Sequence, residues 1–104
     1  MTFISLKQAS DFDHCFKHGK RSKNENFICY QTPNALNCRR LGLMISKRWD
    51  RRASARNQLR RWLKESFRRC DHFSSTDTVV LIRHHAKIHH YHQVERLWEK
   101  LKDN

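Results

Sequence analysis

The sequence predicts one small α/β domain whose helices and strands follow the order α-β-β-α-β-α. Three patterns predict this order. Residues 54–70 sort into two faces at the helical period, residues 40–48 place branched apolar side chains at every second position, and residues 78–82 form a continuous apolar run. A chain of 104 residues that is 38% hydrophobic can bury one modest core. Residues 1–104 are therefore expected to form a single domain.

The first predicted element is a short helix over residues 10–18. Its apolar side chains recur at helical spacing, namely Phe12, Cys15 and Phe16. Ser10 or Asp11 can cap its N-terminus, and Gly19 is placed to end it. A basic cluster follows directly, at Lys17, Lys20, Arg21 and Lys23.

The middle of the chain predicts a hairpin. Residues 27–31 have strand composition, residues 32–38 contain the only proline and predict a turn, and residues 40–48 would form the return strand. The apolar run at 78–82 predicts an interior strand covered on both faces. From Tyr91 onward, apolar residues at helical spacing predict a terminal amphipathic helix.

The helix predicted over residues 54–70 separates a core face from a cationic face. The core face would consist of Ala55, Leu59, Trp62, Leu63, Ser66, Phe67 and Cys70. The cationic face would consist of Arg56, Asn57, Arg60, Arg61, Lys64 and Arg68. Arg56, Arg60 and Lys64 follow one another at one-turn spacing, where like charges repel. A solvated charged face is the alternative, but this repulsion favours a polyanionic partner.

The charge balance also favours nucleic acid as the partner. The chain has 22 Lys and Arg against 10 Asp and Glu, a formal charge of +12. No apolar run approaches the roughly 20 residues that span a bilayer, so no membrane partner is expected. Residues 1–8 are too short and too polar for a signal peptide, which predicts a cytoplasmic protein.

The cysteines and histidines are not expected to form a metal site. Cys15, Cys29, Cys38 and Cys70 lack Cys-x-x-Cys spacing and lie in or beside apolar patterns, so reduced thiols are predicted. Five histidines crowd one segment, at His84, His85, His89, His90 and His92. Their spacing matches no zinc motif, and a polar loop is the interpretation we favour.

Taken together, six runs of the sequence resemble the protein component of bacterial ribonuclease P. The runs are DF at 11–12, FKHG at 16–19, NFICY at 26–30, RLGLMISKR at 40–48, RNQLRR at 56–61 and DTVVLIR at 77–83. Each run is weak alone, but they occur in order and, with the last predicted helix, span nearly the whole chain.

The resemblance implies a two-layer α/β sandwich with a left-handed βαβ crossover, as in the ribosomal protein S5 domain 2-like fold. It also implies a function. In this family an RNA subunit uses Mg²⁺ to hydrolyse the phosphodiester bond that joins the 5′ leader to mature tRNA. The protein binds the catalytic RNA and precursor tRNA, supplies no catalytic residue or metal ligand, and requires no protein partner.

Two groups of site residues follow from the resemblance. The RNA-binding group consists of Lys47, Arg48, Arg51, Arg52, Arg56, Asn57, Arg60, Arg61, Lys64 and Arg68. The cleft for the single-stranded leader consists of Phe12, Phe16 and Tyr30, whose rings suit base stacking. Simple core packing is the alternative for Phe12 and Phe16, and both roles are compatible.

The sequence departs from the family pattern at three places, one of them at Arg60 and Lys64, where the family varies between Lys and Arg. Gln58 stands where an Arg is common, and residues 49–52 replace a small Gly-containing turn with a segment that includes Asp50. Two other functions are considered: a ribosomal-type structural RNA-binding protein, and a metal-dependent nuclease that uses the histidines. The second lacks the clustered carboxylates of a two-metal site.

Overall fold

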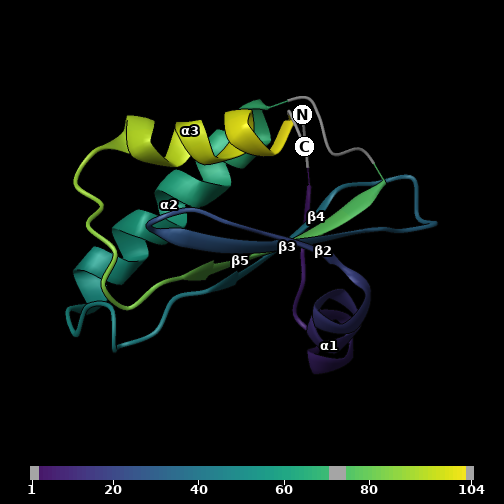
Figure 1. Cartoon of the computed structure of the whole chain (residues 1–104), viewed down its shortest axis with the longest axis horizontal. Helices are drawn as coiled ribbons and strands as arrows, with labels where there is room; N and C mark the ends of the chain where they lie inside the picture. Colours follow the sequence, from purple (N-terminus) through teal and green to yellow (C-terminus); the bar gives the residue numbers. More distant parts are fainter. Residues whose placement is uncertain (1–2, 71–74, 103–104) are drawn as a thin grey trace.

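A five-stranded sheet carries helices on both of its faces (Figure 1). The computed structural model describes residues 3–70 and 75–102. The elements are β1 (Ile4–Ser5), α1 (Ala9–His18), β2 (Lys20–Lys23), β3 (Phe27–Pro33), β4 (Arg40–Met44), α2 (Ala53–Arg69), β5 (Thr76–Ile82) and α3 (Tyr91–Lys102). Helices α2 and α3 lie over one face of the sheet, and α1 lies under the opposite face. The predicted α/β class is confirmed.

Strand β5 lies at the centre of the sheet, in the order β1-β4-β5-β3-β2. It pairs in parallel with β4 and antiparallel with β3. The predicted interior position of residues 78–82 is therefore confirmed. The predicted hairpin between residues 27–31 and 40–48 is wrong, because β5 separates the two strands. The most apolar strand takes the position that buries both of its faces, and this gain outweighs the short connection that favoured a hairpin.

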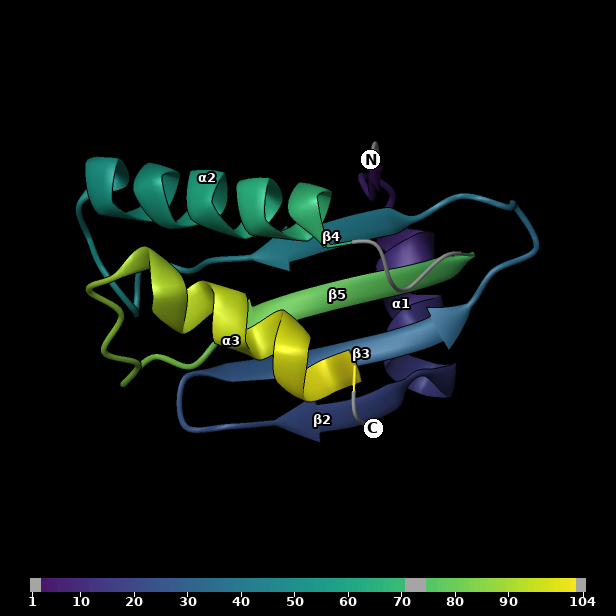
Figure 2. The same cartoon turned by 90° about the horizontal axis from the view of Figure 1, so that it is seen from above.

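The connection from β4 through α2 to β5 is left-handed. Figure 2 looks onto the sheet face that α2 covers; both strands point left and β5 lies below β4. About 98% of such crossovers are right-handed, so general rules predict the wrong hand here. The hand implied by the family resemblance is confirmed.

Two strands were not predicted from the sequence, and the helix cap was predicted wrongly. Strand β1 has only two residues, and β2 (Lys20–Lys23) contains three of the four residues of the basic cluster, to which no element was assigned. Neither Ser10 nor Asp11 caps α1; its N-cap is Gln8, without a side-chain hydrogen bond. Gly19 does end α1, as predicted. A side chain on Gly19 would collide with the Cys15 carbonyl, which explains the glycine.

The main core lies between the sheet and helices α2 and α3. Its largest fully buried side chains include Trp98, Phe27 and Phe67. Trp98 Nε1 donates to Ser66 Oγ at 2.6 Å, and Ser66 Oγ donates to the Trp62 carbonyl at 2.7 Å. Because Ser66 satisfies the indole N–H, a polar residue fits on the core face of α2.

The buried carboxylate of Asp77 on β5 is bonded to Arg40 of the neighbouring strand β4. Asp77 is 2% exposed and receives hydrogen bonds from Arg40 Nε at 2.7 Å and Arg40 Nη2 at 2.6 Å. Asn34 Nδ2 donates a further bond at 2.7 Å. Burial alone would raise the pKa of Asp77, but the bonds from Arg40 and Asn34 outweigh it and lower the pKa.

This ion pair makes the stability of the fold sensitive to acid. Its contribution is complete above the unfolded-state pKa of about 3.9 and is lost as pH falls through the lower folded-state pKa. We expect the free energy of unfolding, measured by urea titration, to decrease below about pH 4. Asp77→Asn should cost about 1.5 kcal/mol at neutral pH and weaken the acid dependence. Superimposable pH curves for the two proteins would contradict this role.

Candidate RNA interface

Helix α2 separates its residues into two faces as predicted. Leu59, Leu63, Ser66 and Phe67 are buried against the sheet and α3. On the opposite side Asn57, Arg61 and Lys64 are exposed. Within the described part of the chain, Arg61 and Lys64 have no ion-pair or hydrogen-bond partner, so their charges remain available to an anion.

The two ends of this cationic face are engaged differently. At its N-terminal end, Arg56 Nη1 donates to the carbonyls of Asp50 and Arg51, each at 2.9 Å, and so braces the preceding loop against the helix. At its C-terminal end, Glu65 pairs with Arg68 at 2.6 Å and with Arg69 at 3.2 Å. Arg56 keeps its charge but is held by backbone carbonyls, whereas Arg61 and Lys64 in the middle of α2 are the cations of this face that no described side chain or carbonyl engages.

A hollow of about 390 Å³ lies along this face. It is lined by Phe3, Asn57, Arg60, Arg61, Lys64, Glu65 and Arg68. Arg60 Nη1 donates to Asn57 Oδ1 at 2.8 Å, which orients both side chains. Phe3, whose ring meets the edge of Phe67 at 5.3 Å, was missed because one aromatic near a terminus carries no periodic signal.

The loop before α2 is basic in spite of its acidic residue. Lys47, Arg48 and Arg51 are exposed there, as is Arg52. Arg52 pairs with Asp50 at 2.9 Å, and hydrogen bonds from Arg52 lower the pKa of Asp50 to about 2. Arg52 thus neutralises Asp50, and the positive charges of Lys47, Arg48 and Arg51 keep the loop basic.

The three predicted aromatic side chains come together on the opposite face of the sheet. Phe16 meets Tyr30 edge to face at 5.1 Å, and Phe12 lies 6.5 Å from Phe16. Gly42 leaves the room that the Phe12 ring occupies, since a side chain there would collide with it. The rings are half-buried and pack on Leu6, Cys15 and Val79. The three rings therefore combine core packing with partial exposure. We call Phe12, Phe16 and Tyr30 the aromatic platform.

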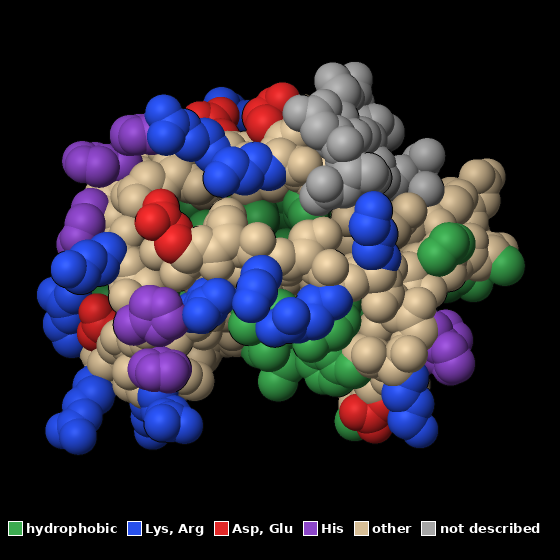
Figure 3. All heavy atoms as spheres, in the orientation of Figure 1, with side chains coloured by type: hydrophobic (Ala, Val, Ile, Leu, Met, Phe, Trp, Pro, Cys, Tyr) green, Lys and Arg blue, Asp and Glu red, His purple; other side chains and the backbone are tan. Residues whose placement is uncertain are grey.

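Strand pairing extends this platform with residues that the sequence did not single out for it. Arg21 is paired with Tyr30 and Lys23 with Ile28, and directly paired residues share a face of the sheet. Met44, which is 45% exposed, continues the apolar surface. Figure 3 shows hydrophobic side chains gathered on the underside of the molecule, with Lys and Arg side chains beside them. The sequence alone shows that residues 20–23 are basic, but the pairing of β2 with β3 is what places them beside Tyr30.

The cysteines and histidines show no metal-binding arrangement in the described ranges. Cys15, Cys29, Cys38 and Cys70 all occur as thiols. Burial raises the pKa of Cys15 to about 11, which keeps this thiol protonated. The five clustered histidines lie in the exposed loop before α3 and in its first turn. Across residues 3–70 and 75–102, no three His, Cys, Asp or Glu side chains are placed to hold a metal ion.

The helices of the described residues include none that is long and apolar enough to cross a membrane. A cationic helix on one side of the sheet and an aromatic platform flanked by lysine and arginine on the other define a basic α/β protein that binds nucleic acid.

Comparison with known proteins gives the family. The family model described as Ribonuclease P matches residues 2–104, and the chain belongs to this family. It is 38% identical over 105 residues to the ribonuclease P protein component of Desulforamulus reducens, covering 95% of this chain and 92% of that protein.

Solved structures agree with this assignment. The RNase P protein of Staphylococcus aureus superimposes with a TM-score of 0.84 at 27% identity, covering 98% of this chain and 94% of the other. The RNase P protein from Thermotoga maritima gives a TM-score of 0.79 at 29% identity and covers 96% of each chain. The resemblance carried by the six sequence runs is confirmed.

Proposed function

We propose that this protein is the RNA-positioning subunit of a ribonuclease P holoenzyme that removes the 5′ leader from precursor tRNA. The observation that carries the proposal is the presence of two RNA-compatible surfaces. They belong to opposite faces of one sheet, since α2 covers one face and α1 the other (Figure 1). One is the cationic face of α2, and the other is the aromatic platform. A protein of this shape can hold one RNA while it grips part of another.

The cationic face of α2 suits a folded RNA. Arg61 and Lys64 are exposed, and the neighbouring pair of Arg60 and Asn57 is already oriented. Guanidinium groups match phosphate oxygens, and an amide can reach a base edge or a ribose. We assign this face, with the basic loop that precedes it, to the catalytic RNA.

The aromatic platform suits the single-stranded leader. Stacking of a base on an aromatic ring contributes about 1–3 kcal/mol and tolerates any sequence, as a leader of variable sequence requires. Arg21 and Lys23 flank the rings and can follow the phosphate backbone. The mature part of the tRNA would then be held mainly by the RNA subunit.

The chemistry is assigned to the RNA subunit together with Mg²⁺. The donor set of the described residues does not fit a magnesium site held by protein alone, since no group of three suitable side chains is present among them. The protein contributes binding and orientation, and no side chain is given a catalytic role. The holoenzyme would act in the cytoplasm without another protein partner.

A ribosomal-type structural RNA-binding protein is the alternative function. Such a protein would not need aromatic rings that remain partly exposed beside lysine and arginine. The half-buried state of Phe12, Phe16 and Tyr30 therefore favours ribonuclease P.

Reconstitution with a bacterial ribonuclease P RNA tests the proposal. At low Mg²⁺, where the RNA alone is slow, adding the protein should accelerate cleavage of precursor tRNA at the 5′ end of the mature sequence. The protein without RNA should show no cleavage. Failure to stimulate the RNA, or cleavage by protein alone, would contradict the assignment.

A further inference from the structure

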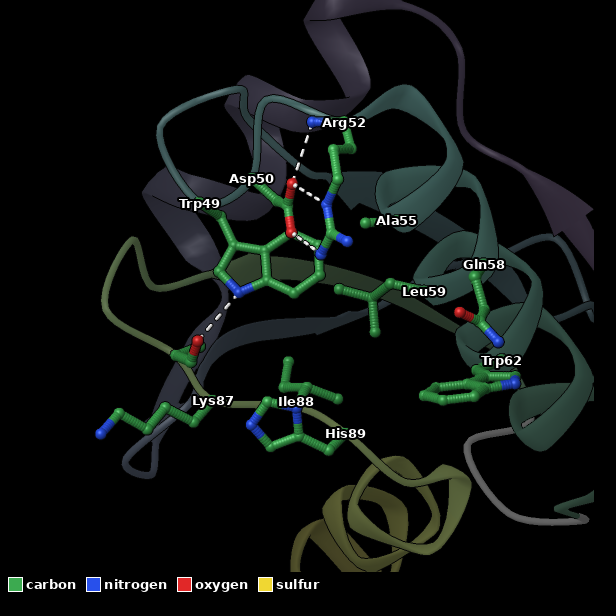
Figure 4. A pocket seen from close by; sticks show the side chains of 11 residues that line it. Trp49, Asp50, Arg52, Ala55, Gln58, Leu59, Trp62, Lys87, Ile88 and His89 are labelled. Carbon is green, nitrogen blue, oxygen red and sulfur yellow. Dashed lines mark hydrogen bonds and ion pairs between the residues drawn. The ribbon is translucent and has the colours of Figure 1, made fainter.

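A second cavity, distinct from the hollow on the cationic face of α2 and from the aromatic platform, lies where α2 begins and is lined in part by the basic loop that precedes the helix. It has a volume of about 290 Å³ and lies between the loop before α2, the first half of α2 and the loop that leads to α3. Figure 4 shows Trp49 and Trp62 on opposite sides of it, with Leu59 and Ile88 between them. Leu59 is 2% exposed and Ile88 is 9% exposed, so they form an apolar floor. We call this cavity the tryptophan pocket.

Both indole walls are held in place before any ligand arrives. Trp49 Nε1 donates to the Ala86 carbonyl at 3.0 Å, which fixes that ring across the two loops. Trp62 meets Tyr91 of α3 edge to face at 6.3 Å. Each indole is half-buried, so part of its surface faces the pocket. A planar ligand would lose little free energy to ordering these walls.

The polar groups of the pocket suit a nucleotide. Gln58 and Lys87 line it and are exposed, and no described residue forms a hydrogen bond with the Gln58 amide or the Lys87 ammonium. A glutamine amide can donate to and accept from one base edge, and its best match is adenine N6 and N7. Lysine binds phosphate as a point charge. Asp50 also lines the pocket, but its carboxylate is paired with Arg52 at 2.9 Å.

We propose that the tryptophan pocket binds one unpaired adenine nucleotide of RNA, with the base between the two indoles and the phosphate near Lys87. The volume is at the lower end of the roughly 300–1,000 Å³ typical of small-molecule pockets, which suits a single nucleotide. The faces of a base inside a duplex are covered by its neighbours, so the ligand must be unpaired. This inference rests on the proposed function in one respect: the nucleotide would belong to an RNA that the holoenzyme contains or binds.

Indole N–H signals in NMR spectra of the full-length protein test the pocket with adenosine 5′-monophosphate as the probe. The three tryptophans give three signals, assigned with Trp→Phe variants. The signals of Trp49 and Trp62 should move saturably during the titration. Trp98 is 2% exposed and bonded to Ser66, so its signal should stay in place. Ribose 5-phosphate at the same concentrations should leave all three unmoved, because it has no base to stack.

Two matched variants sharpen this test. Gln58→Ala should weaken adenosine monophosphate binding about tenfold, through loss of the bidentate contact to the base. Both Gln58 and Lys100 are exposed on helices, so neither substitution threatens the core. Lys100→Ala, which removes a charge from α3, should leave the affinity unchanged.

Two results would overturn the proposal. They are shifts of the Trp49 and Trp62 signals with ribose 5-phosphate that equal those with adenosine monophosphate, and no saturable shift of either signal. None of these experiments contains the RNA subunit. A negative result here would therefore leave the reconstitution test of the proposed function intact.

Discussion

The double variant Arg61→Ala, Lys64→Ala is expected to bind the ribonuclease P RNA about a hundredfold more weakly than the unaltered protein. Both side chains are exposed and unpaired within the described residues, so the substitutions remove charge without breaking an internal contact. A hydrogen bond to a charged group contributes roughly 1.5–3 kcal/mol, and two such contacts account for a loss of about 3 kcal/mol.

Salt dependence distinguishes phosphate contacts from other effects. Each lost phosphate contact should reduce the slope of log affinity against log salt concentration by about 0.7–0.9, so the double variant should lose about 1.5 from the slope. Filter binding or fluorescence anisotropy across a salt series measures both quantities.

A matched pair on α3 provides the control. Arg96→Ala, Lys100→Ala removes the same formal charge from two exposed helical positions away from α2. This variant should keep nearly the original affinity and slope. Equal losses for both double variants would mean that net charge alone drives binding, and no loss for either would make α2 a solvated face.

Arg56→Ala should behave differently from the other arginine substitutions. Because Arg56 braces the carbonyls of Asp50 and Arg51, its loss would free the basic loop as well as remove a charge. The variant is therefore a poor test of phosphate contact by itself.

Replacing Phe16 or Tyr30 by alanine should weaken binding of leader-bearing precursor tRNA to the holoenzyme about tenfold. The loss should be confined to the leader, because one stacking contact is worth about 1–3 kcal/mol and the mature tRNA lies elsewhere. Affinities of the reconstituted holoenzyme for precursor and for mature tRNA measure the selectivity. The affinity for mature tRNA should stay nearly unchanged.

Two controls separate stacking from folding. Tyr30→Phe retains the ring and should retain the selectivity, whereas Leu36→Ala removes an exposed apolar side chain outside the aromatic platform and should have no effect. Circular dichroism and thermal unfolding show whether each alanine variant still folds. If a folded Phe16→Ala or Tyr30→Ala protein loses equal affinity for both tRNAs, the rings belong to the core and not to a leader site.

Local patterns in the sequence determined the elements that face a core on one side. The period of α2 separated Leu59 and Leu63 from Arg61 and Lys64, and the apolar run of β5 predicted its interior position. These predictions succeeded because side-chain periodicity within one element records which face is buried. The order of the six family-like runs determined the family in the same local way.

Only the tertiary structure decided which elements become neighbours. The pairing of β5 with both β3 and β4 excluded the predicted hairpin, and the register of β2 placed Arg21 beside Tyr30. The tryptophan pocket likewise combines residues from two loops and a helix, among them Trp49 and Trp62. Such arrangements depend on how much apolar surface the whole chain can bury at once, and no single segment contains that information.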